Sequence, residues 1–227
     1  MEANIKNIIS YSQPKSVIAE EFRAIRTNIQ YSNLDKKIKT IVVTSTTKDE
    51  GKTTITTNLG VNFSKIENKK VLIIDCDLRN PSIHKEFGIS NSNGLTDLLV
   101  EEKDLSNYIK ETEINNLHIL TSGSIPPNPS EMLSSNRMKV FMETIREEYD
   151  YIFIDTPPVG MVTDAGVLSA FLDGTILVVK SEFVDIKDLQ ETKKKLVSVN
   201  ANILGVILNA NKVKKDDYYY YSYYGGR

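Results

Sequence analysis

Gly51, Lys52 and Thr53 are the residues of this sequence whose types and spacing most clearly predict chemistry. They come after a β-branched run and a polar loop, and a helix-compatible stretch follows them. In this order, backbone N–H groups and the helix N-terminus face phosphates, the lysine neutralises them and the threonine hydroxyl binds magnesium. The consensus G-x-x-x-x-G-K-[ST] is met except at its first glycine, where Thr46 stands. The group predicts a loop that binds the phosphates of a magnesium nucleotide.

Aspartates follow two further apolar runs. One run leads into Asp75 and Asp77, and the other ends at Asp155. Because the carboxyl ends of parallel strands share one edge of a sheet, we expect these acids to lie beside the phosphate loop. Three carboxylates would repel a triphosphate unless a divalent cation lay between them, and magnesium prefers such oxygen ligands. Each aspartate taken alone is also typical of a turn or a helix cap.

The elements that must position these residues alternate along the chain from residue 38 onward. The predicted strands are residues 40–44, 71–75, 117–120, 151–155, 174–180 and 203–208. The predicted helices are residues 17–31, 53–66, 95–100, 130–148, 164–171 and 186–199. Such alternation predicts an α/β fold, a P-loop NTPase-like and mostly parallel sheet with helices on both faces.

The ends of the chain differ from this central part. Residues 1–15 are polar and reach a turn at Pro14, which predicts a flexible arm. Residues 16–211 form the predicted domain. Residues 212–227 carry little varied apolar surface, which predicts a flexible tail.

The composition argues against several classes of protein, among them general nucleic-acid binders, membrane-spanning proteins and disulfide-bonded proteins. The net charge of -2 gives no general attraction to nucleic acid or to an anionic membrane. No apolar run approaches the ~20 residues that cross a bilayer, and no signal peptide is recognised at the start. The single cysteine, Cys76, is interpreted as a small buried filler; it excludes an intramolecular disulfide and favours an intracellular location. His84 and His118 lack metal-ligand spacing with it and are interpreted as structural.

Tyrosines gather near the end of the sequence. Six of the eleven lie there: Tyr218, Tyr219, Tyr220, Tyr221, Tyr223 and Tyr224. One interpretation is a segment that adds a strand or binds protein surfaces. The other is a set of phosphorylation acceptors on a flexible segment, where each phosphate would add about -1.5 to -2 charge.

Together these motifs resemble the bacterial tyrosine kinases (BY-kinases) of capsule and exopolysaccharide systems, in their cytoplasmic Gram-positive form. The resemblance includes the phosphate loop, the two aspartate motifs and the tyrosines. It also includes Glu20, Arg23 and Arg26, which match the family's E-x-x-R-x-x-R oligomerisation motif. From the residues alone, Glu20 and Arg23 predict only an i,i+3 pair of ~0.2–0.5 kcal/mol on a helix face.

The resemblance implies an autokinase that uses ATP and Mg²⁺ and phosphorylates its tyrosine tail between subunits of a ring. Lys52, Asp75, Asp77 and Asp155 would be the catalytic residues, with Asp75 as the base, although Asp75 and Asp77 could exchange roles. Thr53, Asp77 and Asp155 would hold the metal. The implied nucleotide contacts are Asp49, Glu50, Gly51, Lys52, Thr53, Thr54, Arg79 and Asn209, with Asn209 at the adenine.

The family also implies partners and a location. A separate membrane-anchored activator of the polysaccharide co-polymerase type would recruit the cytoplasmic chain to the inner face of the membrane. A cognate tyrosine phosphatase would reverse the modification, and no nucleic acid is involved. One departure from the family is the pair Lys48 and Asp49, where Pro-Gly is frequent.

Two alternatives remain at this stage. A partitioning-type nucleotide-switch ATPase shares the fold, but it usually has a lysine early in its phosphate loop, where Thr47 stands here. The second acid at Asp77 and the tyrosine tail favour the kinase. The other alternative is a catalytically silent scaffold whose tail binds partners.

Overall fold

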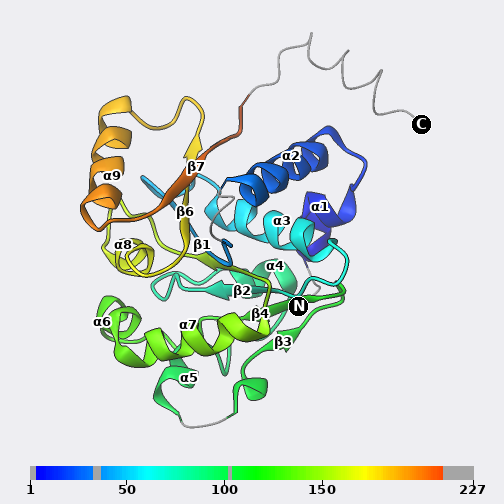
Figure 1. The fold of residues 1–227 in the computed structure, drawn as a ribbon, viewed down its shortest axis with the longest axis vertical. Helices are drawn as coiled ribbons and strands as arrows, with labels where there is room; N and C mark the ends of the chain where they lie inside the picture. The colour runs from blue at the N-terminus through cyan, green and yellow to red at the C-terminus, as the bar shows by residue number, and fades with distance from the viewer. Residues whose placement is uncertain (1–3, 33–36, 102–103, 212–227) are drawn as a thin grey trace.

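The sheet places the aspartates and the phosphate loop at one edge. The computed structural model describes residues 4–32, 37–101 and 104–211. Within these residues seven strands form one sheet in the order β3-β4-β2-β5-β1-β6-β7 (Figure 1). The strands are β1 (Thr40–Ser45), β2 (Val71–Asp75), β3 (Lys110–Glu111), β4 (Leu117–Leu120), β5 (Tyr151–Asp155), β6 (Gly174–Lys180) and β7 (Ile203–Asn209). All pairings are parallel except that of β3 with β4.

Helices cover both faces of the sheet, as the alternating pattern predicted. One face is covered by η1 (Asn4–Asn7), α1 (Ile9–Ser12), α2 (Val17–Tyr31), α3 (Lys52–Ser64) and α4 (Ile83–Phe87). The other face is covered by α5 (Leu95–Val100), η2 (Leu105–Asn107), α6 (Pro129–Ser134), α7 (Asn136–Glu148), α8 (Asp164–Ser169) and α9 (Ile186–Ser198). The predicted fold class is therefore confirmed.

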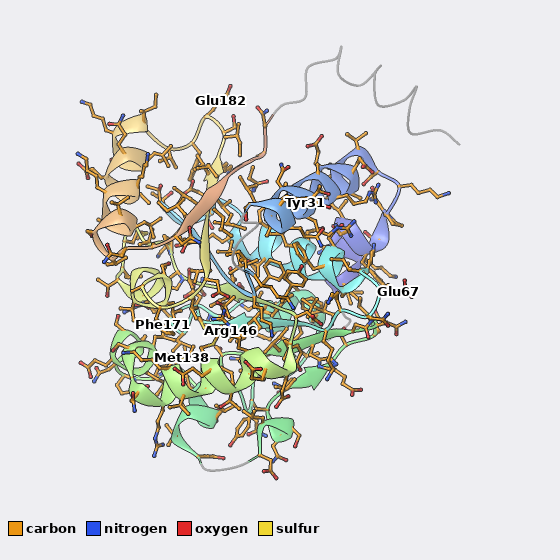
Figure 2. All side chains as sticks on the ribbon, viewed as in Figure 1. Tyr31, Glu67, Met138, Arg146, Phe171 and Glu182 are labelled. Atoms are coloured by element: carbon orange, nitrogen blue, oxygen red, sulfur yellow. The ribbon has the colours of Figure 1, made fainter. Side chains whose placement is uncertain are left out.

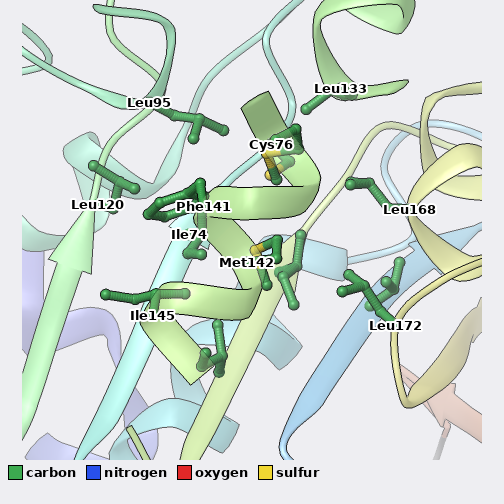
Figure 3. Packing of buried hydrophobic residues seen from close by; sticks show 14 of the residues in the cluster. Ile74, Cys76, Leu95, Leu120, Leu133, Phe141, Met142, Ile145, Leu168 and Leu172 are labelled. Carbon is green, nitrogen blue, oxygen red and sulfur yellow. The ribbon is translucent and has the colours of Figure 1, made fainter. Parts of the chain in front are cut away.

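Each central strand contributes side chains to two apolar clusters. Val42 and Ile154 belong to the cluster under α7, whereas Val43 and Phe153 belong to the cluster under α3. Burial on both faces explains why these strands read as continuous apolar runs. Figure 3 shows the sulfur of Cys76 among the apolar side chains of the first cluster, and the thiol is fully buried. The interpretation of Cys76 as a buried filler agrees with this packing.

The amino-terminal segment corrects one prediction. Residues 4–12 are not a flexible arm, because they form η1 and α1 with Ile5 and Ile8 buried in the second cluster. Ser10 is fully buried; its N–H donates to Asn58 Oδ1 at 2.8 Å, and its Oγ accepts from Asn62 Nδ2 at 2.8 Å. Two isoleucines and one serine in a polar stretch therefore help to hold the segment against α3.

The predicted helix at residues 130–148 is also corrected. It is interrupted at Ser135, whose backbone is extended and whose Oγ accepts the Met138 N–H at 3.2 Å. Ser135 thus caps a new helix, α7, after α6 has ended.

Figure 2 shows Met138 and Arg146 on α7 in the lower half of the view, and Glu182 beyond the far end of β6.

Short elements were not predicted from the sequence. These are η1, α1, α4, η2 and β3. In the part of the chain that the structure describes, no helix has the length and apolar character required to cross a bilayer.

Candidate active site

The phosphate loop joins β1 to α3 through two residues with left-handed backbones. Asp49 has φ 61° and Gly51 has φ 90°. A Cβ atom on Gly51 would lie 2.1 Å from Asn209 Nδ2, so only glycine fits at this position. Aspartate tolerates the left-handed region better than most residues, and the Asp49 side chain is exposed. The pair Lys48 and Asp49 therefore forms a turn that keeps its side chains at the surface.

Glu50 ties this loop to the ends of two strands. Its carboxylate is fully buried and accepts the Thr47 N–H at 2.6 Å and the Lys180 N–H at 3.1 Å. Its backbone oxygen accepts Asn209 Nδ2 at 2.8 Å. Two residues predicted to contact nucleotide, Glu50 and Asn209, thus contact each other at the carboxyl edge of the sheet.

Lys52 is the first residue of α3, one residue before the predicted start of this helix at residue 53. The lysine is only 9% exposed although it is charged. Its charge opposes the effect of burial on the pKa values of Asp77 and Asp155. A lysine in this position offers a cation to incoming phosphates. Thr54 also lies in the first turn of α3, with its side chain exposed.

Asp155 ends β5 and meets two threonine hydroxyls from α3. Thr53 Oγ1 donates to Oδ2 at 2.7 Å, and Thr56 Oγ1 donates to Oδ1 at 3.2 Å. The Asp155 side chain is almost fully buried, and this burial raises its pKa to about 6 despite the hydrogen bond from Thr53. Thr53 Oγ1 also lies 2.9 Å from Ser82 Oγ.

Asp75 organises the loop that follows β2. Its Oδ1 accepts the Asp77 N–H at 3.2 Å, and its Oδ2 accepts the N–H groups of Ser82 and Ile83 at 3.0 Å each. The carboxylate is fully buried, and burial together with the charge of Asp155 raises its pKa well above the ordinary value. Asp75 therefore joins the two ends of its loop.

The side chain of Asp77 is more exposed than that of Asp75. Its side chain is partly buried, and its Oδ1 accepts the Asn80 N–H at 3.0 Å. Desolvation raises its pKa, while the Asn80 hydrogen bond and the charge of Lys52 act in the opposite direction. Asp77 therefore lies within the electrostatic reach of Lys52.

Arg79 donates hydrogen bonds to Asp164 and Ser130, two residues that no sequence motif indicated. Its Nε donates to Asp164 Oδ2 at 2.9 Å, and its Nη2 donates to Asp164 Oδ1 and to Ser130 Oγ at 3.1 Å each. Asp164 looked like an ordinary first residue of a helix, and the sole sequence signal was an acid soon after Asp155. Ser130 and Thr56 gave no signal of their own.

The oligomerisation motif lies on α2, which packs on α3. Glu20 and Arg23 form the predicted i,i+3 ion pair, and Arg23 Nη1 also donates to the Pro14 carbonyl at 2.9 Å. Arg26 turns inward, where its Nη1 donates to the Asn62 carbonyl at 2.9 Å. These three residues are thus separate from the aspartates at the sheet edge.

The donor set suits magnesium. Among residues 4–32, 37–101 and 104–211, no group of three or more His, Cys, Asp or Glu side chains is arranged to hold a metal ion. Magnesium, however, keeps several waters and binds through one or two carboxylates plus substrate phosphates. The hydroxyl of Thr53 and the carboxylate of Asp155, 2.7 Å apart, meet that requirement.

The six tail tyrosines from Tyr218 to Tyr224 lie outside the described residues.

Comparisons with known proteins show what this chain is similar to. Residues 38–205 match the family model described as an AAA domain. The chain is 38% identical over 220 residues to the tyrosine-protein kinase YwqD of Bacillus subtilis (strain 168), covering 97% of this chain and 92% of YwqD.

Two solved structures are similar to this chain in fold. The chimerical protein CapA2B2 has a TM-score of 0.88 and 39% identity, covering 92% of this chain and 91% of CapA2B2. The septum site-determining protein MinD of Pyrococcus horikoshii OT3, complexed with Mg-ADP, has a TM-score of 0.64 and 25% identity, covering 79% of this chain and 75% of MinD.

Proposed function

The chain belongs to the bacterial tyrosine kinases, and from that premise we propose that it transfers the γ-phosphoryl group of ATP to tyrosine hydroxyls. The observation that carries the proposal is the contact between Thr53 Oγ1 and Asp155 Oδ2 at 2.7 Å. This hydrogen bond joins the first turn of α3, which follows the phosphate loop, to the Asp155 carboxylate at the carboxyl edge of the sheet. Phosphoryl transfer is mainly alignment and charge neutralisation, which such a site can supply.

The donor side of the reaction uses residues of α3 and β5. Lys52 neutralises the β and γ phosphates, and the backbone N–H groups after Gly51 receive their oxygens. Thr53, Asp155 and Asp77 would hold Mg²⁺, directly or through water. When bound, this ion neutralises charge on the phosphate oxygens.

The acceptor side uses the acid pair Asp75 and Asp77. Tyrosine titrates near pH ~10 and aspartate near ~3.9, so a carboxylate orients the hydroxyl first and accepts its proton late. The raised pKa values of both acids narrow that gap. Asp75 is the proposed base and Asp77 a metal ligand, although the two acids could exchange these roles, and the Asp77 N–H donates to Asp75 Oδ1 at 3.2 Å.

The remaining nucleotide contacts are proposed from their places in the fold. Asn209 contacts adenine from the end of β7, where it already lies against the loop. Asp49, Glu50 and Thr54 shape or border the phosphate cradle. Arg79 supports the nucleotide site or the incoming tail.

The proposed acceptors are in the tail of a neighbouring subunit. They are Tyr218, Tyr219, Tyr220, Tyr221, Tyr223 and Tyr224. Glu20, Arg23 and Arg26 contribute to the interface of a closed ring that brings a tail to the next site. Glu20 is exposed, and the Arg23 side chain is 36% exposed.

Partners follow from the same premise. A membrane-anchored activator of the polysaccharide co-polymerase type stabilises the competent state and recruits the cytoplasmic chain to the inner face of the membrane. A tyrosine phosphatase reverses the modification. The cycle regulates capsule or exopolysaccharide synthesis and export.

One experiment tests the kinase proposal. The purified chain is incubated with ATP and Mg²⁺, with and without the cytosolic segment of a candidate activator, and phosphate is mapped by mass spectrometry. We expect phosphate on residues 218–224. ATP hydrolysis with an unmodified tail under both conditions would instead favour a nucleotide switch like MinD. If the chain neither hydrolyses ATP nor becomes labelled, the result would favour a silent scaffold.

A further inference from the structure

Arg79 is held from outside its own loop. Its guanidinium forms a two-pronged contact with Asp164, from Nε to Oδ2 at 2.9 Å and from Nη2 to Oδ1 at 3.1 Å. The same Nη2 donates to Ser130 Oγ at 3.1 Å, and Ser130 Oγ donates to Asp164 Oδ1. A planar guanidinium bound at two nitrogens has a fixed orientation, which a single contact does not give.

The contact is unequal in burial. The Asp164 side chain is fully buried, whereas the Arg79 side chain is 42% exposed. Within the described part of the chain, the Asp164 carboxylate accepts hydrogen bonds from Arg79 and Ser130 alone. A buried carboxylate requires such compensation, so it holds the arginine strongly while the arginine remains at the surface of the site.

The contact connects three segments around the active site. Arg79 belongs to the loop after β2, Asp164 begins α8 after the loop that follows β5, and Ser130 lies in α6. The hydrogen bonds of the Asp75 carboxylate are with the two ends of the first loop, at the N–H groups of residues 77, 82 and 83. Arg79 fixes the centre of that loop, two residues after Asp77.

We propose that Asp164 and Ser130 are positioning residues for phosphoryl transfer, which hold the Arg79 guanidinium and the loop that carries Asp77 against the Asp155 side of the site. The proposal rests on the proposed function, because it concerns the same site. Asp164 and Ser130 act through Arg79 and need not touch the substrate.

A second ion pair serves as a matched control. Arg146 Nη2 lies 2.7 Å from Asp173 Oδ1, with the arginine 37% and the aspartate 14% exposed. Asp173 also accepts the N–H groups of Lys39 and Thr40 at 2.9 Å, before and at the start of β1. It therefore fixes the amino edge of the sheet, away from the phosphate loop. Loss of this pair reports what a purely structural ion pair contributes.

The experiment compares full-length chains with the activator segment present. The variants are Asp164→Asn, Ser130→Ala, Arg79→Ala, the double variant Asp164→Asn with Arg79→Ala, and the control Asp173→Asn. ADP release and tail labelling give kcat and the KM for ATP, and hydrogen exchange reports the backbone amides between residues 77 and 83, except at Pro81, which has no N–H. Because both product assays are read, a wild type that hydrolyses ATP without labelling refutes the kinase function but still tests the positioning role.

The expected kinetic result is a loss in kcat without a matching change in KM. Displacement of a reacting group by ~1 Å can cost ~10²-fold, so we expect about 10- to 100-fold for Asp164→Asn and a smaller loss for Ser130→Ala. Because Asp164 acts through Arg79, the double variant should match Arg79→Ala to within about 2-fold. Amides 77–83 should exchange faster in Asp164→Asn and Ser130→Ala than in Asp173→Asn.

Several results would overturn the proposal. Additive losses in the double variant would mean that Asp164 does not act through Arg79. An equal loss of kcat in Asp173→Asn would mean that any broken ion pair has this effect. If Asp164→Asn does not fold, Ser130→Ala decides alone, and unchanged exchange of amides 77–83 in that variant refutes the proposal even where no turnover is detected.

Discussion

Thr53 Oγ1, at the start of α3, donates to Asp155 Oδ2, at the end of β5, over 2.7 Å. The two side chains come from segments separated by 102 residues in sequence. Their contact places the phosphate loop beside the Asp155 carboxylate, because β1 and β5 are parallel neighbours. The central part of the candidate active site thus follows from strand order.

Replacement of Lys52 by methionine should abolish tail labelling. The substitution keeps an unbranched, nearly buried side chain but removes the cation that is proposed to neutralise the phosphates. Lys48→Met is the matched control, because Lys48 is exposed in the same loop. Phosphotyrosine on residues 218–224 is measured by mass spectrometry. Persistent labelling in the pure Lys52 variant would remove this residue from the mechanism.

The raised pKa of Asp155 predicts a pH dependence of stability in the ligand-free protein. Burial raises this pKa from 3.8 to about 6, so between these values the folded state binds more protons than the unfolded state. The free energy of unfolding should therefore fall as pH rises through about 6, and the stabilising contribution is complete below 3.8.

Chemical denaturation at a series of pH values measures this effect. Asp155→Asn removes the titrating group and should reduce the slope over the same window. Asp75 and Asp77 have raised pKa values as well, so part of the slope should remain in the variant. An unchanged slope in Asp155→Asn would show that this carboxyl does not titrate as inferred.

Asp75→Asn and Asp77→Asn should differ in stability although both reduce phosphorylation. An amide at position 75 turns an N–H₂ group toward backbone donors, and an unsatisfied buried group costs about 1–3 kcal/mol of unfolding free energy. Asp77 is partly buried, and its carboxylate accepts the Asn80 N–H, so its variant should lose less. Thermal unfolding measures the difference. Equal losses would contradict the structural role of Asp75.

The sequence indicated the fold and most of the site because these depend on local patterns. Apolar runs give the strands, and the order of Gly51, Lys52 and Thr53 between strand and helix gives the loop. Because the sheet is parallel, all three aspartates were predicted to share one edge, and contacts such as Thr53 with Asp155 agree with this.

The parts that were missed depend on long-range contacts. Asp164 reads as a helix start until its pairing with Arg79, 85 residues away, is visible. Ser10 reads as part of a polar arm until it is seen between Asn58 and Asn62 of α3. Tertiary packing, and not a local preference, determines the role of each of these residues.

Gly51→Ala should destabilise the protein for two separable reasons. The new Cβ would lie 2.1 Å from Asn209 Nδ2, and the backbone has φ 90°. A left-handed backbone costs a non-glycine residue roughly 1–2 kcal/mol, apart from any clash. Adding Asn209→Ala to Gly51→Ala removes the clash but not the strain, so the double variant should recover part of the loss in unfolding free energy. Denaturation of both single variants and the double variant measures the two contributions; additive losses would show that the side chain of Asn209 does not restrict position 51.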